Sequence, residues 1–319
     1  MQRILSSFVL LFAFASAAFA APAPDELLSS GRADEALRDL QQRLSANSSD
    51  AAAHNLLCRT YFALEDWEPA VRSCERSVEL QPNSSLYLMW LGRAYGRRAE
   101  HVGPLSAYSM AKKSLDAMDR AVKLDPANTD ARRDLAEYLA TAPGVAGGDH
   151  GRALKLADEI AARDLPTASW IRALVASADG DKYEAERQHK IAIQASGESP
   201  ATLLELAHFY RKQKRWSELE SLVDRATSGK PTPSDLFDAG ELLVTNGRNL
   251  NAAVALLQRY LSGKTDESGP AFRAHWLIGQ ALEKSGDKEG AAKQYRAALT
   301  LASNYRLAQE SLRRLGVAA

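Results

Sequence analysis

The sequence predicts an all-α protein, built as a solenoid of stacked helical pairs. One phrase recurs about seven times: a small residue, an apolar one four positions later, and a second small one three positions after that. A proline often follows five residues later, as in Ala70, Cys74, Ser77 and Pro82. An amphipathic segment and a polar turn, such as Asp179-Gly180-Asp181, precede most copies. Because each unit of such an array contacts only its neighbours, the pattern favours binding of a partner over catalysis of a reaction.

The first element is a processing signal, which we predict over residues 1–20. Arg3 precedes an apolar run from Ile4 to Ala18, and Ala18-Phe19-Ala20 has the pattern of a cleavage site. Residues 21–319 are then the helical repeat domain. We expect an exported, soluble protein, periplasmic or else secreted, with no membrane insertion after cleavage. An uncleaved N-terminal anchor is the alternative.

Charge and cysteine usage narrow the class of partner. Forty Lys and Arg balance forty Asp and Glu, so neither nucleic acid nor a membrane surface is favoured. Cys58 and Cys74 lie at equal distances on either side of the turn at Asp66, which predicts equal heights on an antiparallel helix pair. Two outcomes remain open at this point: a disulfide in an oxidising compartment, or two small buried side chains.

Helical units follow one another along the rest of the chain. The piece at Gly31–Leu44 shows a second helix with a short first one, and the best complete units span Ala51–Asn83 and Phe272–Ser303. Weaker units begin near Leu86, Asp130, Thr167, Ala201 and Asp235. The amphipathic segment from Tyr305 to Leu315 is the expected capping helix, because its apolar face can cover the last unit.

These units resemble the tetratricopeptide repeat family, whose units are helix-turn-helix pairs of 34 residues. The turn Gly286-Asp287-Lys288-Glu289-Gly290-Ala291 is similar to the family's turn, although Leu88 and Leu203 replace its early tryptophan. The resemblance implies a right-handed superhelical solenoid of about seven to eight units plus the C-terminal cap. It also implies that the first helix of each pair lines a concave groove.

Two consecutive units carry insertions. About ten extra residues lie near 97–106, and about five lie near 142–149, in a glycine-rich stretch. That stretch lacks the Gly-Lys-Ser/Thr ending of a phosphate-binding loop. The insertions either flank one site or reflect drift at tolerant surface turns.

Nothing in the sequence calls for catalysis. The histidines are spread one or fewer per unit, without the spacing of a helical metal site, and His189 occupies a packing position. Neither cysteine lies in a nucleophile motif. We therefore predict no catalytic residue, cofactor or metal, and no enzymatic activity.

The predicted partner-binding groove comprises residues on the free face of the first helices: Asn55, Arg59, Arg93, Arg97, Arg133, Trp170, Leu174, His208, Arg211 and Trp276. Met89 is placed on the same face. Arginine forks suit carboxylates, so an acidic protein segment or extended peptide is the expected ligand. Trp170 and Trp276 are the expected exposed anchors, whereas Trp67 and Trp216 are expected to pack. Alternatively, this is a solvated face whose arginines pair with neighbouring carboxylates.

The function predicted from these observations is a non-enzymatic scaffold of the cell envelope that binds a protein or peptide in its groove. Two alternatives stay open: a structural subunit of an envelope assembly, and a small-molecule-binding component of a transport system. The sequence leaves open whether the array is an open arc or a closed ring, and what its oligomeric state is.

Overall fold

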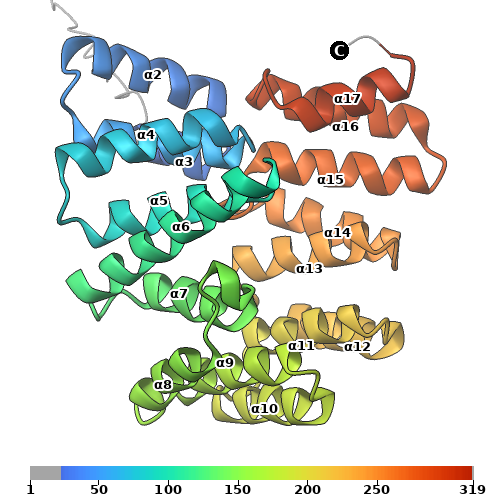
Figure 1. The fold of residues 1–319 in the computed structure, drawn as a ribbon. Coiled ribbons are helices and arrows are strands. Elements are labelled where there is room, and N and C mark those ends of the chain that lie inside the picture. Colours follow the sequence, from blue (N-terminus) through green and yellow to red (C-terminus); the bar gives the residue numbers. More distant parts are fainter. Residues whose placement is uncertain (1–22, 318–319) are drawn as a thin grey trace, which may run out of the picture.

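The computed structural model describes residues 23–317, so the predicted cleavage site at Ala20 lies outside the described residues. Within this range the chain forms seventeen α-helices, one 3-10 turn and no strand. Sixteen helices form eight successive pairs, and one more follows (Figure 1). The pairs are α1 (Pro24–Ser29) with α2 (Ala33–Ala46), α3 (Ala51–Ala63) with α4 (Trp67–Leu80), α5 (Ser85–Ala99) with α6 (Pro104–Leu124), α7 (Thr129–Thr141) with α8 (His150–Ile160), α9 (Leu165–Ala178) with α10 (Lys182–Ala195), α11 (Pro200–Lys212) with α12 (Trp216–Ser228), α13 (Pro233–Thr245) with α14 (Leu250–Leu261) and α15 (Ala271–Lys284) with α16 (Lys288–Leu301); α17 (Arg306–Arg314) follows.

Helix starts are fixed at the same place in successive units. The first helices of the second to seventh pairs each follow a residue whose side chain accepts a hydrogen bond from the third backbone N–H of the helix: Asp50, Ser84, Asn128, Asp164, Ser199 and Thr232. Such caps satisfy one of the backbone donors that a helix start leaves free. Because these caps fix the residue at which each first helix begins, they also fix which side chains of that helix share a face.

Small residues allow the two helices of a pair to pack closely, as the sequence predicts. A Cβ at Gly279 would lie 2.4 Å from the ring of Tyr295, and one at Gly92 would lie 2.8 Å from Met118. These glycines occupy the position at which the first helix meets the apolar residue of the repeated phrase. A larger side chain there would push the pair apart.

The solenoid closes on itself. Figure 1 shows α2 beside α16 and α17, and a buried cluster joins Ala33 of α2 and Leu64 to Phe272 of α15 and Tyr305. The backbone N–H of Ser303 donates to the Asp34 carboxylate at 2.9 Å. Of the two shapes that the sequence leaves open, the described chain adopts the closed one. The predicted cap α17 therefore lies between the last unit and the first, because Ala308 shares this cluster while Leu312 packs on α16.

The second insertion packs against α6. The first lengthens the start of α6, and the second forms a 3-10 turn at Gly144–Ala146. The hydroxyl of Tyr138 lies 2.8 Å from the carbonyl oxygens of both Ala111 and Ala146, so it connects α6 to the 3-10 turn. Arg97, at the edge of the first insertion, lines a cavity described below, whereas residues 142–149 line none of those cavities.

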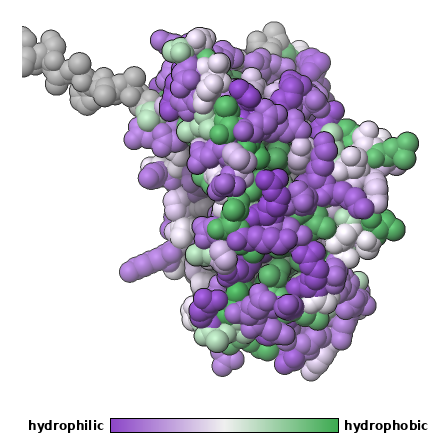
Figure 2. Space-filling model, turned by 60° about the vertical axis from the view of Figure 1, so that its left-hand side comes forward, coloured by the Kyte–Doolittle hydropathy of each residue, from purple (hydrophilic) through white to green (hydrophobic). Residues whose placement is uncertain are grey.

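No helix within residues 23–317 is long and apolar enough to cross a bilayer. The face in Figure 2 is mostly hydrophilic, with hydrophobic side chains in small separate groups. Scattered exposed apolar residues of this kind are ordinary on the surface of a folded protein.

Candidate partner-binding cavity

Closure of the solenoid produces a cavity of about 730 Å³, with the second and third units on one side and the last two units on the other. One wall comes from α3, α4 and α5. The opposite wall comes from the segment between α14 and α15, residues 262–270, together with Ser234 and Arg273. Because the walls are more than a hundred residues apart in sequence, the cavity exists only in the closed arrangement.

The wall on α3, α4 and α5 combines positive charge with aromatic rings. We call it the arginine-aromatic wall, and it comprises Arg59, Phe62, Trp67, Trp90, Arg93 and Arg97. The guanidinium carbon of Arg93 lies 4.8 Å from the centroid of Trp90, and that of Arg59 lies 5.6 Å from the same ring. Arg97 lies 5.1 Å from Trp67. These distances fit cation-π contact, which holds the guanidinium groups against the wall.

Each arginine of this wall also contacts a carboxylate of the chain. Arg59 binds Glu267 through two parallel hydrogen bonds, the one from Nε being 2.8 Å long. Arg93 binds Asp134 of α7 in the same forked way, at 2.5 and 3.2 Å. Arg97 pairs at 2.7 Å with Glu100, three residues on. The pairing to neighbouring carboxylates that we considered as an alternative therefore describes Arg97, whereas Arg59 and Arg93 bind carboxylates of distant elements.

Burial modifies the charge on this wall. It disfavours the charged guanidinium of Arg59, but the hydrogen bonds that Arg59 donates to Glu267, together with the negative charges of Glu267 and Asp25, outweigh this effect and raise the pKa of Arg59. Burial raises the pKa of Asp134, against the opposing effect of Arg93. Arg59 and its partner are about one fifth exposed, so a solute in the cavity can reach both.

Two smaller cavities continue the first along the interior. One, of about 350 Å³, shares Asp134 and Ser234 with it, and the next, of about 180 Å³, shares Glu137 and Trp170 with the second. The second cavity is rich in carboxylates. Desolvation inside the superhelix, with Glu205 and Asp134 nearby, raises the pKa of Glu137. The lining thus changes from arginine-rich in the first cavity to acid-rich in the second.

Most of the predicted groove residues line these connected cavities. Arg59, Arg93 and Arg97 line the first cavity. Arg133 lines the second, Leu174 and Arg211 line the third, and Trp170 and His208 line both of these. His208 lies 2.8 Å from Asp238. Burial opposes protonation of His208, but this hydrogen bond raises its pKa.

Three predicted positions are wrong. Asn55 is only 2% exposed and lines none of these cavities, because it faces the packed interior of its unit. Met89 is buried in a core cluster with Leu88. Trp276 is half-buried in the last units: its Nε1 donates to Ser311 at 3.2 Å, and its ring meets Tyr305 edge-on. Trp276 is therefore a packing residue.

Trp170 lies at the cavity wall but is not the exposed anchor that we expected. It is 6% exposed, because the guanidinium group of Arg133 covers its ring at 3.9 Å. Its Nε1 donates to Glu205 at 2.8 Å, and Arg133 binds the other oxygen of that carboxylate. The three side chains form a closed unit that leaves little of the ring for a ligand.

Sequence reasoning missed Trp90 and Glu267. Trp90 lies one position after Met89, and its spacing of three to Arg93 is the signal that would have found it. Trp67, expected only to pack, is 8% exposed and also contributes to the first cavity. Glu267 carries no local signal, because it lies 208 residues from its partner.

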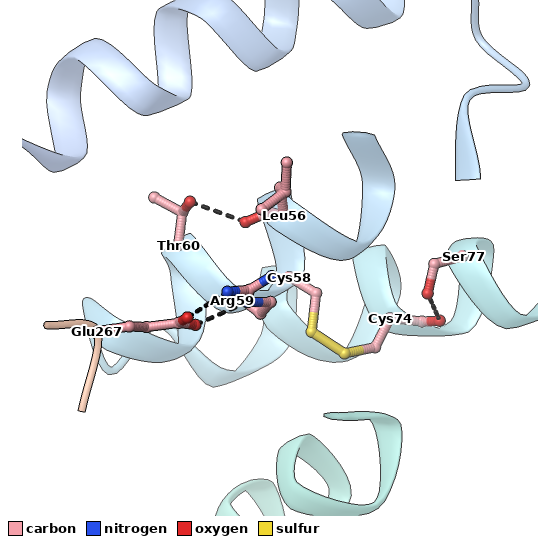
Figure 3. Close-up of a disulfide and its surroundings, with 7 residues drawn as sticks. All are labelled: Leu56, Cys58, Arg59, Thr60, Cys74, Ser77 and Glu267. Carbon is pink, nitrogen blue, oxygen red and sulfur yellow. Dashed lines mark hydrogen bonds and ion pairs between the residues drawn. A yellow bond between two sulfur atoms is a disulfide. The ribbon is translucent and has the colours of Figure 1, made fainter. Parts of the chain in front are cut away.

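A disulfide supports the arginine-aromatic wall. The structure joins Cys58 of α3 to Cys74 of α4, with the Cα atoms 5.1 Å apart. Figure 3 shows the bond beside Arg59 and its contact with Glu267. Because Cys58 precedes Arg59, the bond fixes the helix pair from which Arg59 and Trp67 extend. Within residues 23–317 no cluster of three His, Cys, Asp or Glu side chains is placed to hold a metal.

The chain belongs to the tetratricopeptide repeat family. Three models of that repeat match residues 27–93, 202–235 and 237–306, more than half of the sequence together. No curated protein matches the sequence. Members of the family typically serve as scaffolds for protein interaction, and the fold supports this general class.

Among solved structures, yeast Tom70 is similar at the level of the fold. Yeast Tom70 is 16% identical and has a TM-score of 0.52; the match covers 97% of this chain and 66% of the Tom70 chain. A tetratricopeptide repeat protein from Parabacteroides merdae is also 16% identical, with a TM-score of 0.42, over 85% of this chain and all of the other. This chain spans about two thirds of the Tom70 chain that it matches.

Proposed function

We propose that this protein is an exported scaffold that binds an extended acidic segment of a partner protein in its central cavity. The observation that carries the proposal is the arginine-aromatic wall, where Arg59 and Arg93 lie against Trp90 with their forks engaged by carboxylates. The two intramolecular carboxylates show the chemistry that these forks accept.

The shape of the site favours an extended chain. Closure leaves a cavity of about 730 Å³, which admits a few side chains and excludes a folded domain. Trp90 and Phe62 supply apolar surface for the parts of a ligand between its charges, as aromatic anchors do in other interfaces. A preformed wall limits the loss of conformational entropy to the ligand.

Export is supported by two features. The first twenty residues have the composition and cleavage pattern of a signal peptide. The bond between Cys58 and Cys74 is of the kind that persists in oxidising compartments. We infer a periplasmic location, which cell fractionation and N-terminal sequencing of the mature protein will test: an N-terminus at Ala21 is expected, and an intact Met1 would contradict cleavage.

The binding proposal is tested with an envelope extract of the source organism and tagged mature protein. We expect one partner to be retained by wild type and lost by Arg93→Gln and by Trp90→Ala. Arg248→Gln is the matched control, because Arg248 also lies against a tryptophan and pairs with a glutamate, but outside the cavity. Each variant must keep the helicity and the melting temperature of wild type, so that a lost partner reports a lost contact and not unfolding. Retention of the same partner by Arg93→Gln and Trp90→Ala would place the interface elsewhere.

A second candidate function is favoured by the size and the lining of the cavity. A small anionic molecule with an apolar body would fit the same wall, and the protein would then be the binding component of a transport system. Native mass spectrometry of protein purified from its host separates the two functions. A bound species of small mass that is absent from Trp90→Ala supports the second, and a peptide supports the first.

A further inference from the structure

We propose that Glu267 is a built-in competitor for this site, and that a partner's carboxylate binds by replacing Glu267 on Arg59. The inference rests on the proposed function and adds its regulation. Glu267 approaches Arg59 from a different wall of the cavity and makes both hydrogen bonds of a carboxylate-guanidinium fork. It therefore occupies the position that a ligand carboxylate would take.

The segment that carries Glu267 is shaped independently of Arg59. Residues 262–270 connect α14 to α15, and Asp266 organises them by accepting hydrogen bonds from Ser268, Gly269 and Ser234. The hydroxyl of Tyr260 accepts from the backbone N–H of Asp266 at 2.8 Å. The segment is thus held in place by anchors that remain when the contact between Glu267 and Arg59 opens.

Two further contacts hold the segment. The hydroxyl of Thr265 donates to the backbone carbonyl of Ser29 at 3.0 Å. Gly269 lies so close to Phe237 that a Cβ would be 2.3 Å from its ring. The side chain of Glu267, by contrast, bonds only Arg59 among the described residues. A ligand can therefore turn this one side chain away without unfolding the segment.

Replacement has a definite consequence for affinity. A ligand carboxylate that takes the place of Glu267 exchanges one ion pair for another of the same kind, so the net gain at Arg59 is small. Removing the negative charge of Glu267 leaves Arg59 open to the ligand and should strengthen binding of acidic ligands. The gain must vanish when Arg59 is also removed, because the competition acts through that residue alone.

The test is a double-mutant cycle with fluorescein-labelled hexaglutamate as the probe, followed by fluorescence anisotropy at fixed low ionic strength. We expect Glu267→Gln to bind the probe about five- to tenfold more tightly than wild type. Arg59→Gln should bind more weakly than wild type, and adding Glu267→Gln to it should change nothing. Glu220→Gln is the matched control, because Glu220 pairs with Arg248 outside the cavity. Hexalysine replaces hexaglutamate in a parallel measurement, which shows how much of the binding is non-specific electrostatic attraction.

Each result decides between the two proposals. If wild type binds hexaglutamate through Arg59 but Glu267→Gln binds it equally well, the competitor role is wrong and the proposed function stands. If neither wild type nor Glu267→Gln binds the probe, the acidic-ligand function falls and the competitor role with it. A gain of the same size in Glu220→Gln would also overturn the competitor role, because net charge alone would then explain it. Circular dichroism and melting temperature confirm that the variants are folded.

Discussion

At the residue scale, the position of a side chain on its helix decides whether it packs or lines the cavity. Counting from packing positions places Arg59 and Arg93 on the inner face, and they line the cavity. The same counting is wrong by one position at Met89, and so misses Trp90. A helix position differs from the next by about 100°, so an error of one residue exchanges a core residue for a wall residue.

His189 gives a prediction at this scale. It is 4% exposed and its Nδ1 has no hydrogen-bond partner within the described chain. Burial, assisted by Lys212, lowers the pKa of His189 to about 4. Because the folded-state pKa lies below the unfolded one, the unfolded state binds more protons and stability falls as the pH falls below about 6.5.

We expect wild type to lose about 2 kcal/mol of unfolding free energy between about pH 7.5 and pH 5, relative to His189→Leu. Urea unfolding of both proteins at the two pH values measures the difference. His208 acts in the opposite direction, because its raised pKa gives a contribution to stability that is present at low pH and is lost as the pH rises. Both proteins contain His208, so its contribution cancels in the comparison. A wild type and a His189→Leu variant with parallel pH profiles would show that His189 is charged in the folded protein.

At the scale of elements, the sequence specifies each helix pair almost completely. Caps such as Asp50 begin the first helices, and turns such as Gly286, with a φ of 92°, join the two helices of a pair. These signals are local, so they are visible in the chain. The sequence leaves the disulfide open, since packed helix axes are often too far apart for one. In the structure, the close approach of α3 and α4 brings the Cα atoms of Cys58 and Cys74 within 5.1 Å.

The disulfide predicts how the α3 and α4 pair behaves when it is reduced. The bond closes a loop between residues 16 apart, for which chain entropy gives a stabilisation of about 3 kcal/mol. We expect the double variant Cys58→Ser, Cys74→Ser to lose about 2 to 3 kcal/mol of unfolding free energy. Guanidinium unfolding with and without a reductant measures this. A reductant should destabilise wild type and leave the double variant unchanged, and equal stability of all samples would contradict the prediction.

At the scale of the whole molecule, closure decides the site, and closure cannot be predicted from any single repeat. It depends on the small rotation between successive units, summed over eight pairs, so minor differences in packing determine whether the first unit meets the last. The sequence predicts Arg59 on the inner face. Glu267 becomes its partner only because the rotations between successive units add up to a closed arrangement. The residues on one wall of the cavity were therefore accessible to sequence reasoning, and the opposite wall was not.

Gly31 offers a test of closure. It has a φ of 71° in the turn between α1 and α2, and a Cβ there would lie 2.4 Å from the backbone nitrogen of Ala271. Gly31→Ala should push the first unit away from α15, whereas Gly180→Ala imposes the same kind of backbone strain, at a φ of 83°, with no atom within 4 Å of the added Cβ. The difference in stability between the two variants therefore measures only the steric effect where the first unit meets α15.

We expect Gly31→Ala to be less stable than Gly180→Ala by about 1 to 3 kcal/mol in urea unfolding, the usual cost of overpacking. Small-angle X-ray scattering should show a larger radius of gyration for Gly31→Ala only, because the seam between the ends of the solenoid is opened. A Gly31→Ala variant with the scattering profile and stability of the control would mean that the ends of the solenoid are not held together in solution.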